Sequence, residues 1–530
     1  MKTSNKRISF VSIVLAFVLI LTACAGGNNA GSESAKPSES AKGTDASATP
    51  KEEPKETLKP YEVSIVYLDI PQKDEVAVEQ KLNEYLKDKI NATIDLRPID
   101  PSSYKQKTEL MINTGEKFDL IFSGSSQGFW SNVTKGAYLE LDELLDKYGQ
   151  GIKDNLHPLY LEGPRYKGKL YAIPTNKEIT QGKALVFRKD LVDKYAIDYQ
   201  SINSMADLEP WLKLMKEKEP DILGQYVWSN NPMDYLMYET NSDYREVGPV
   251  PSVGGTQVPL FLMDFKAADM KVKTVLDPEI VAINKKEYEL YRSYYKSGYI
   301  NEDAAISKTP YVQIMRQGKI WSNRSSYKPG TEIQQHIASQ QKYEWVAKQL
   351  AEPLVTTEKV TSAQMSISRT SGDPARAMMV LNYLHTDPYV INLIVNGIEG
   401  THYKKVGDNR IELIPDSGYA TAINWVLGNQ MINYLRPGEP DDIYEQFKKY
   451  NDEVTRFPLL GFYFDDTNVK NELSQLNAIV AEYVTISTGA VDNPSKMLDE
   501  RNEKLKKAGI EKVQAEMQKQ IDEWVTANKK

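Results

Sequence analysis

Cysteine and histidine are scarce in this chain of 530 residues, which contains one Cys and four His. A single thiol cannot form an intramolecular disulfide, and it cannot supply the several thiolates of a zinc or iron–sulfur site. The histidines show no metal-ligand spacing, so we expect no metal site. A basic excess is also lacking, because 65 Lys and Arg face 73 Asp and Glu. Nucleic-acid-binding domains usually show the opposite balance, so we expect no nucleic-acid partner.

The apolar run at residues 10–21 follows the cationic residues Lys2, Lys6 and Arg7 and is interrupted only by Ser12. A helix of twelve residues reaches ~18 Å, short of the ~30 Å hydrocarbon core of a bilayer. The run therefore has the length and flanks of a secretory signal peptide rather than of a membrane-spanning helix. We expect residues 1–23 to be this signal peptide.

The only cysteine, Cys24, lies just after this apolar run. It ends the segment Leu21-Thr-Ala-Cys24, which resembles a bacterial lipobox. In such lipoproteins the cysteine sulfur carries a diacylglycerol, and the new amino terminus is often acylated, for example with palmitate. Two or more acyl chains hold a protein stably on a membrane. An ordinary signal peptide with an unrelated cysteine is the alternative. Residues 24–59 are too poor in large apolar side chains to fold and predict a disordered tether. We expect a lipid anchor on the extracellular face of the cell membrane, and the Lys-rich, Arg-poor composition favours a Gram-positive host.

From residue 61 the pattern changes to alternating strands and helices. It predicts strands at 63–68, 92–96 and 118–122, with helices over 78–86 and 104–114 between them. This order predicts a parallel sheet with helices on its faces. Ligands of such sheets bind beyond the carboxyl ends of the strands, where the loop 123–130 lies.

Later segments continue the α/β pattern. Helices are predicted at 205–218 and around the tyrosine stripe at 288–295, and a strand at 318–322. Asp373 and Asp387 each precede a proline and predict helix N-caps. Gly397 is expected to close the second of these helices as a left-handed C-cap.

Several segments in this order carry a family pattern. In the first 403 residues they are Phe118–Phe122, Gly136–Leu145, Leu170–Pro174, Val186–Leu191, Ser371–Asp387 and Asn396–Tyr403. Together they resemble the family 1 extracellular solute-binding lipoproteins of bacterial ABC transporters, the maltose-binding-protein-like group. The tail segments are Trp425–Asn429, Gly461–Asp465, Lys504–Ile510 and Gln518–Gln520. They resemble a domain of unknown function that caps the large, oligosaccharide-type subgroup.

The resemblance implies a two-lobed α/β fold of the periplasmic-binding-protein type (type II), with a hinge and an interlobe ligand cleft. The first lobe is expected at 60–175 plus 350–400, and the second at 176–349 plus 401–530 with a C-terminal helical extension. It also implies a monomer without catalytic residues or cofactor. Such a protein captures an oligosaccharide and delivers it to the permease and ATPase subunits of an ABC transporter.

Aromatic residues are abundant, with 32 Tyr and 7 Trp, and sugar rings need aromatic faces beside hydrogen-bonding groups. Trp130, Ser123, Ser125 and Gln127 lie in or just after the loop that follows the third predicted strand. Further candidates are Trp228, Trp321 with Asn323 and Arg324, Trp425, and Tyr403 and Glu399 from the family segment. Arg324 has the geometry to bind a uronate carboxylate. For each of these residues a purely structural role is the alternative.

Two other functions remain open. A surface glycoside hydrolase would need two carboxylates flanking a glycosidic bond, and no motif in the sequence identifies such a pair. A lipoprotein of the same fold that binds peptides would need groups to neutralise an ammonium and a carboxylate. The identity, length and charge of the sugar do not follow from the sequence.

Overall fold

The computed structural model describes residues 58–227, 243–253, 256–421 and 423–528. The predicted signal peptide, Cys24 and the tether through residue 57 lie outside these ranges, as does Trp228. Among the described residues no helix has the length and apolar character to cross a membrane. The same residues contain no cluster of His, Cys, Asp and Glu suited to a metal ion.

The first sheet has the strand order β2-β1-β3-β16-β6. Its strands are β1 (Tyr61–Leu68), β2 (Ala92–Ile99), β3 (Leu120–Phe122), β6 (Ile173–Pro174) and β16 (Gln364–Ile367). β2, β1 and β3 run parallel, as predicted, whereas β16 pairs antiparallel with both β3 and β6. Residues 63–67 of β1 are all buried, as expected for a strand that is covered on both faces.

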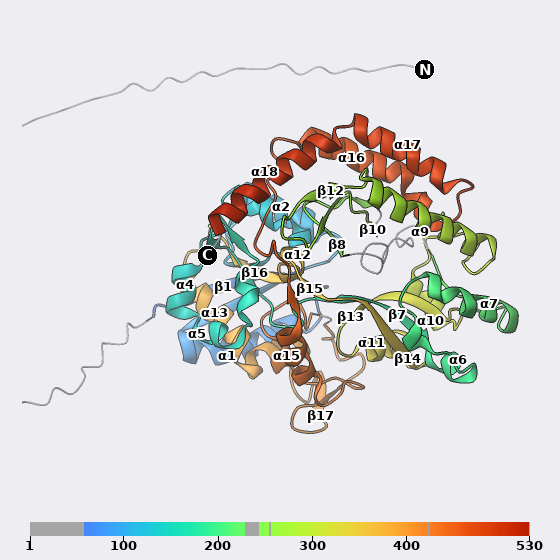
Figure 1. Cartoon of the computed structure of the whole chain (residues 1–530). Coiled ribbons are helices and arrows are strands. Elements are labelled where there is room, and N and C mark those ends of the chain that lie inside the picture. Colours follow the sequence, from blue (N-terminus) through green and yellow to red (C-terminus); the bar gives the residue numbers. More distant parts are fainter. Residues whose placement is uncertain (1–57, 228–242, 254–255, 422, 529–530) are drawn as a thin grey trace, which may run out of the picture. The chain divides into compact units, whose positions relative to one another are not determined.

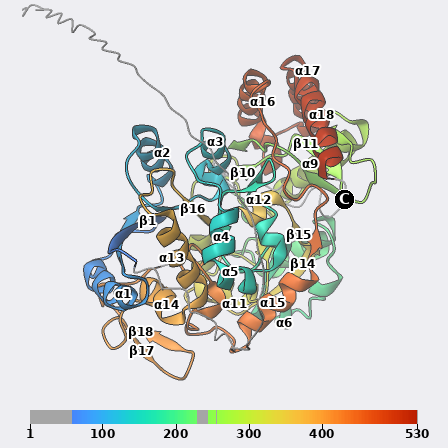
Figure 2. The same ribbon diagram turned by 90° about the vertical axis from the view of Figure 1, so that its left-hand side faces the viewer.

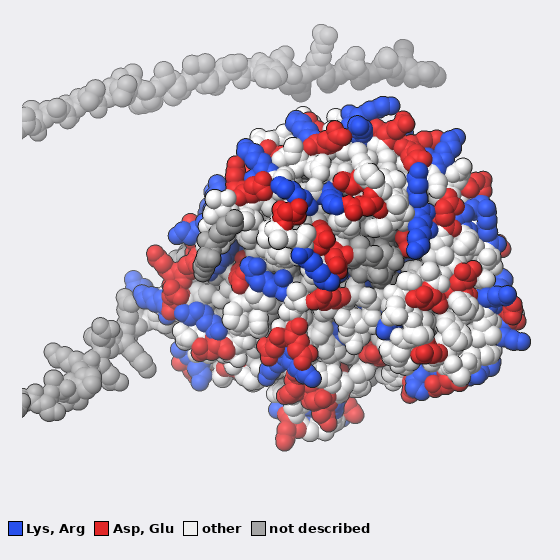
Figure 3. Space-filling view, in the orientation of Figure 1, with Lys and Arg blue, Asp and Glu red and all other residues white. Residues whose placement is uncertain are grey.

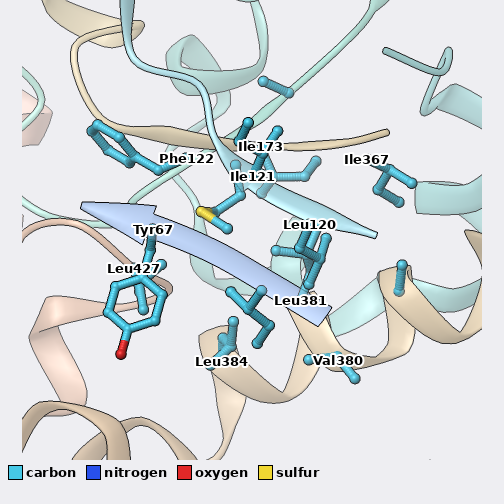
Figure 4. Packing of buried hydrophobic residues seen from close by; sticks show 14 of the residues in the cluster. Tyr67, Leu120, Ile121, Phe122, Ile173, Ile367, Val380, Leu381, Leu384 and Leu427 are labelled. Atoms are coloured by element: carbon cyan, nitrogen blue, oxygen red, sulfur yellow. The ribbon is translucent and has the colours of Figure 1, made fainter. Parts of the chain in front are cut away.

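Helices pack on both faces of this sheet. They are α1 (Glu75–Ile90), α2 (Tyr104–Thr114), α3 (Phe129–Thr134), α4 (Asp142–Tyr148), α5 (Gln150–Asn155), α13 (Pro374–Thr386) and α14 (Pro388–Asn396). Helix α13 lies against α4 and α5 (Figure 2). Leu120, Leu381 and Leu384 are among the fully buried side chains that α13 and the strands contribute to the first core (Figure 4).

Helix ends follow the predicted capping residues with one exception. Gly115 closes α2 in the left-handed conformation, with φ 68°. Asp373 accepts a hydrogen bond from the backbone N–H of Arg376, at 2.9 Å, at the start of α13. Gly397 does not form the predicted left-handed cap, because its φ of 79° is combined with a ψ of −149°. This conformation is open to glycine, and the ring of His402 occupies the space a Cβ would need.

The second core surrounds two antiparallel sheets rather than a continuation of the parallel pattern. One has the order β13-β7-β14, from β7 (Gly182–Arg188), β13 (Ser322–Tyr327) and β14 (Trp345–Ala351). The other has the order β12-β11-β8, from β8 (Tyr244–Glu246), β11 (Phe261–Asp264) and β12 (Val272–Thr274). The strand predicted at 318–322 begins only at Ser322, because Gly318 (φ 72°) is still part of the preceding turn.

The helices of the second core include the C-terminal ones. They are α6 (Lys189–Lys194), α7 (Glu209–Lys218), α9 (Pro278–Lys296), α10 (Tyr311–Arg316), α11 (Thr331–Ala338), α16 (Lys470–Tyr483), α17 (Pro494–Lys507) and α18 (Ile510–Asn528). Helices α16, α17 and α18 lie together (Figure 1), with α17 against α9 and α18 against β12. The C-terminal tail is therefore an integral part of the second core.

Several short elements connect or flank the cores. They are α12 (Thr357–Val360), α15 (Ile443–Glu453), β4 (Arg165–Tyr166), β5 (Lys169–Leu170), β9 (Ser252–Val253), β10 (Thr256–Gln257), β15 (Leu354–Val355), β17 (Tyr403–Lys405), β18 (Ile411–Leu413) and β19 (Thr455–Arg456). The chain passes between the cores through residues 175–181, again through 352–363, and a third time near β19, which pairs with β15. Ile423, Val426 and Leu427 pack into the first core, although they lie in the range 401–530 that was predicted for the second lobe.

Asp387 provides a test of local stability. Its carboxylate accepts hydrogen bonds from the N–H groups of Tyr389 (2.9 Å) and Val390 (3.3 Å) at the start of α14, and from the Tyr85 hydroxyl (2.7 Å). Asp387→Ala is expected to lower the free energy of unfolding by about 1–2 kcal/mol, measured by urea denaturation. Asp88→Ala, at an exposed position of α1, should change it by less than about 0.5 kcal/mol. Equal effects of the two substitutions would contradict the capping role.

Candidate binding site

A cavity of about 440 Å³ opens between the two cores. We call it the Glu178 cavity. One side is formed by Ile179, Asn424 and Trp425, which pack with or beside the first core, and the other by Lys328 and Ile333 near β13 and α11. This volume lies within the range of sites for small molecules, ~300–1,000 Å³. It is the kind of cavity in which two lobes can enclose a ligand.

Glu178 lies in the first crossover segment, whose backbone is fixed from both sides. Asn451 of α15 accepts the N–H of Ile179 at 2.8 Å and donates to the carbonyl of Lys177 at 2.8 Å. The Tyr160 hydroxyl donates to the same carbonyl at 2.5 Å. Thr180 donates to the carbonyl of Leu354 in the second crossover, at 2.6 Å. These bonds hold the two crossover segments together and place Glu178 in the cavity wall.

The Glu178 carboxylate is nearly inaccessible, with 2% of its side chain exposed. Its Oε1 atom lies 2.9 Å from Lys328 Nζ and 3.4 Å from Lys177 Nζ, and it accepts a hydrogen bond from Gln181 at 2.9 Å. Burial alone would raise the pKa of Glu178, but the two lysines and Gln181 outweigh burial and lower this pKa to about 2. Oε2 has no hydrogen-bond partner among the described residues. Glu178 thus lines the cavity as a buried, ionised side chain whose second oxygen is covered and has no partner among the described residues.

Trp425 provides the aromatic surface of this cavity. It directly precedes Val426 and Leu427 of the first core, and Phe122 contacts its ring edge-on at 6.1 Å. The residue is nevertheless 40% exposed. Across the cavity the Lys328 ammonium lies 5.6 Å above the ring of Phe447. The Glu178 cavity therefore combines an open indole, apolar side chains, amides and fixed charges.

Trp130 and Ser125 lie in a different cavity, of about 650 Å³, which we call the Tyr463 cavity. The Trp130 ring stacks on Tyr463 with 4.7 Å between centroids and 20° between planes. Ser125 also lines this cavity. Ser123 is buried at the end of β3 and bonds to Ser366 at 2.6 Å, and Gln127 donates to Ser126 at 3.1 Å. Of the candidates from this loop, Trp130 and Ser125 thus line a different cavity from Trp425.

The residues around Trp321 are in the second core. Trp321 is fully buried and packs against Phe187 with 5.3 Å between ring centroids. Asn323 and Arg324 are also buried on β13, where Arg324 donates to the carbonyl of Tyr226 at 3.1 Å. We therefore leave Trp321 out of the candidate site.

Glu399 and Tyr403 lie in or next to the β17–β18 hairpin. The hairpin projects at the end opposite to α16–α18 in both ribbon views (Figures 1 and 2). Glu399 is exposed and pairs with Lys405 at 3.3 Å, and the buried Tyr403 packs beside Tyr434. Neither residue lines either cavity.

Gly124–Gly128 spells the pattern Gly-x-Ser-x-Gly, which in some hydrolases carries a serine nucleophile. Such a serine needs a histidine as general base. Here Ser126 is an exposed residue that accepts a hydrogen bond from Gln127. None of the four histidines is bonded to Ser126. The rings of His157, His336 and His402 form hydrogen bonds with Leu159, Tyr343 and Asp74, respectively, and His385 is buried in the first core. The pattern does not form a catalytic triad.

Glu178, Lys177, Gln181 and Lys328 did not emerge from the sequence as candidates. A signal was present, because Lys177-Glu178 lies between the apolar segments 170–174 and 184–187. A charged pair between two buried strands marks a crossover between cores. The surface gives no comparable indication, since Lys and Arg alternate with Asp and Glu over the face in Figure 3.

Three crossover segments, two cores and a polar-aromatic cavity between the cores define a two-lobed binding protein. Comparison with known protein families agrees with this description, because residues 71–390 match the model of the bacterial extracellular solute-binding proteins. The chain belongs to this family. Residues 458–526 match a domain of unknown function.

Two relatives illustrate the similarity. A carbohydrate ABC transporter substrate-binding protein of Streptococcus pneumoniae serotype 4 is 30% identical over 456 residues, covering 84% of this chain and 87% of the relative. The crystal structure of the N-glycan transport solute binding protein from S. pneumoniae has a TM-score of 0.75 and 27% identity, covering 89% of this chain and all of that one. The same protein in complex with Man5GlcNAc has a TM-score of 0.64, 27% identity and coverage of 89% and 99%.

The low pKa of Glu178 makes a prediction for acid stability. Because the folded-state pKa (about 2) lies below the ordinary 4.5, the ionised carboxylate stabilises the fold above pH 4.5, and this contribution is lost as the pH falls toward 2. Glu178→Gln should lower the free energy of unfolding by about 3 kcal/mol at pH 7, since it leaves two lysines without their partner.

Urea denaturation between pH 7 and pH 2 measures this effect. The difference between wild type and Glu178→Gln should shrink as the pH falls below 4.5, because the carboxyl of the unfolded chain takes up its proton there first. It should be smallest near pH 2, where the native carboxyl becomes neutral as well. Glu503→Gln, whose side chain is 78% exposed, is the control and should have little effect at any pH. A difference for Glu178→Gln that stays constant with pH would contradict the assignment.

Proposed function

We propose that this protein captures a neutral oligosaccharide in the Glu178 cavity and delivers it to the permease of an ABC transporter. The observation that carries the proposal is the juxtaposition of the open Trp425 ring and the buried Glu178 carboxylate in a cavity between two cores. A sugar presents C–H faces to an indole and hydroxyl groups to a carboxylate. The Oε2 atom of Glu178 is covered in this conformation and has no partner among the described residues, and it is the acceptor that such a hydroxyl would use once the ligand displaces the side chains that cover it.

The relatives support a sugar as the ligand class. One is named a carbohydrate transporter component, and a structural neighbour was solved with Man1GlcNAc and with Man5GlcNAc. Oligosaccharides of mannose and N-acetylglucosamine are therefore the first ligands to test. Lobes at 60–175 plus 350–400, joined by the segment 423–427 that packs into the first core, and at 176–349 plus the remainder of 401–530 would close around the ligand by hinge motion, and the transporter would recognise the closed form.

The protein is also proposed to release its ligand chemically unchanged. A glycoside hydrolase needs a carboxylic acid that is protonated near the working pH. Glu178 does not meet this requirement, because its lysine partners lower its pKa to about 2 and keep it ionised. It can accept a hydrogen bond but has no proton to donate to a leaving group at neutral pH.

Trp425→Ala tests the site. Loss of the stacking surface should weaken oligosaccharide binding at least tenfold, ~1.4 kcal/mol, measured by isothermal titration calorimetry with Man1GlcNAc and Man5GlcNAc. Tyr389→Ala is the control, because Tyr389 is 45% exposed on α14 and lines neither cavity. Unchanged affinity in Trp425→Ala, with wild-type binding intact, would remove Trp425 from the site.

We propose that Cys24 is lipidated and anchors the protein to the extracellular face of the membrane. Cys24→Ser removes the sulfur that would carry the acyl chains, so the protein should shift from the detergent phase to the aqueous phase in a detergent-partitioning experiment. Cys24→Ala should behave in the same way. Partitioning that is the same in wild type and both variants would contradict the anchor.

A further inference from the structure

The Tyr463 cavity has the composition of a second carbohydrate site. With about 650 Å³ it is larger than the Glu178 cavity, and it also lies between the cores. Trp130, Ser125 and Ser126 contribute from the loop and helix after β3, and Val247 from the strand region after β8. Further parts of the wall come from residues 356–358 and from residues 457–466. All these residues belong to the described part of the chain.

The domain of unknown function provides that wall. Leu459, Phe462, Tyr463, Phe464 and Asp466 all line the cavity and all lie within its matched range, 458–526. A hydrogen bond of 2.8 Å from the Gly461 N–H to Thr357 Oγ1 fixes this segment to the second crossover. The position of Tyr463 is thus set by backbone bonding and not only by its contact with Trp130.

The chemistry of the lining matches a sugar better than an apolar ligand. Tyr463 and Trp130 contribute aromatic rings to the lining, and Ser125, Ser126, Thr356 and Thr357 contribute hydroxyl-bearing side chains. Burial, followed by the charges of Asp466 and Asp465, raises the pKa of Tyr463 to about 12, so its hydroxyl stays a hydrogen-bond donor. Three carboxylates, of Glu246, Glu358 and Asp466, and one ammonium, of Lys105, line the cavity. This balance disfavours an acidic ligand.

The two cavities meet the same short element. Thr356, Thr357 and Glu358 line the Tyr463 cavity, and the next residue, Lys359, lines the Glu178 cavity together with Ser362. Helix α12 thus contributes to the walls of both cavities. A linear chain held in the Glu178 cavity needs only to pass α12 to reach the second space.

We propose that the Tyr463 cavity binds the distal sugars of a long oligosaccharide, and that the C-terminal domain of unknown function supplies the stacking surface for them. This inference rests on the proposed function. It assigns to the C-terminal domain a role in chain-length selectivity: short ligands occupy the Glu178 cavity alone, and long ligands occupy both.

Ser126→Trp tests the proposal because it fills the Tyr463 cavity without removing any packing residue. Ser126 is an exposed residue that lines this cavity. Affinity for Man5GlcNAc should fall at least tenfold, and affinity for Man1GlcNAc should stay within twofold of wild type, measured by isothermal titration calorimetry. Ser131→Trp introduces the same side chain at an exposed position of α3 outside the cavity and should change neither.

Tyr463→Ala provides the second variant, with thermal unfolding as the check that it folds. It should show the same selective loss of Man5GlcNAc affinity as Ser126→Trp. Equal losses for both ligands, or no loss for either in both variants, would overturn the assignment of the Tyr463 cavity. Failure of the wild-type protein to bind either oligosaccharide would instead contradict the proposed function, and this inference would fall with it.

Discussion

The buried charge of Glu178 is the constraint on which the arrangement of the two cores depends. A carboxylate that is 2% exposed is tolerated only when cations and donors compensate for its lost hydration. Those groups come from separate parts of the chain: Lys177 and Gln181 from the same crossover, and Lys328 from the segment after β13. The crossover must therefore pass close to β13, and this proximity creates the cavity between the cores.

The same constraint connects stability to recognition. One oxygen of Glu178 is committed to the lysines, and the other is buried without a partner among the described residues, which is why we propose it as an acceptor for a ligand. Trp425 is positioned by the segment at 426–430, which is bonded to the crossover through Asn176 and Gly428 at 2.9 Å. The carboxylate and the indole are therefore set by one hydrogen-bonded unit. A site of this kind is preorganised on rigid backbone, which reduces the entropy cost of binding.

The sequence predicts the first core well because its signals are local. Buried β-branched strands, Gly115 and the Asp-Pro pairs are readable within a few residues, and the structure confirms the helix over 104–114 and both N-caps. The antiparallel sheets of the second core were not predicted, since strand direction depends on partners far apart in the chain.

Trp425 was among the candidates, yet nothing in its neighbourhood distinguished it from Trp321. Their difference comes from long-range packing: Phe187 and the segment at Leu223 cover Trp321. Glu178 escaped notice because its burial requires Asn451 and Lys328, which lie 273 and 150 residues further along the chain.

A thermal-unfolding screen of the purified wild-type protein tests the central claim, the capture of a neutral oligosaccharide, most directly. The panel should contain neutral and uronic oligosaccharides, with peptides for comparison. A ligand at one hundred times its dissociation constant stabilises the native state by ~2.7 kcal/mol, which gives a clear rise in Tm. The account predicts a rise with neutral oligosaccharides, and the same sugars recovered intact afterwards. A rise with peptides alone, or shortening of the sugar in the same tube, would contradict it.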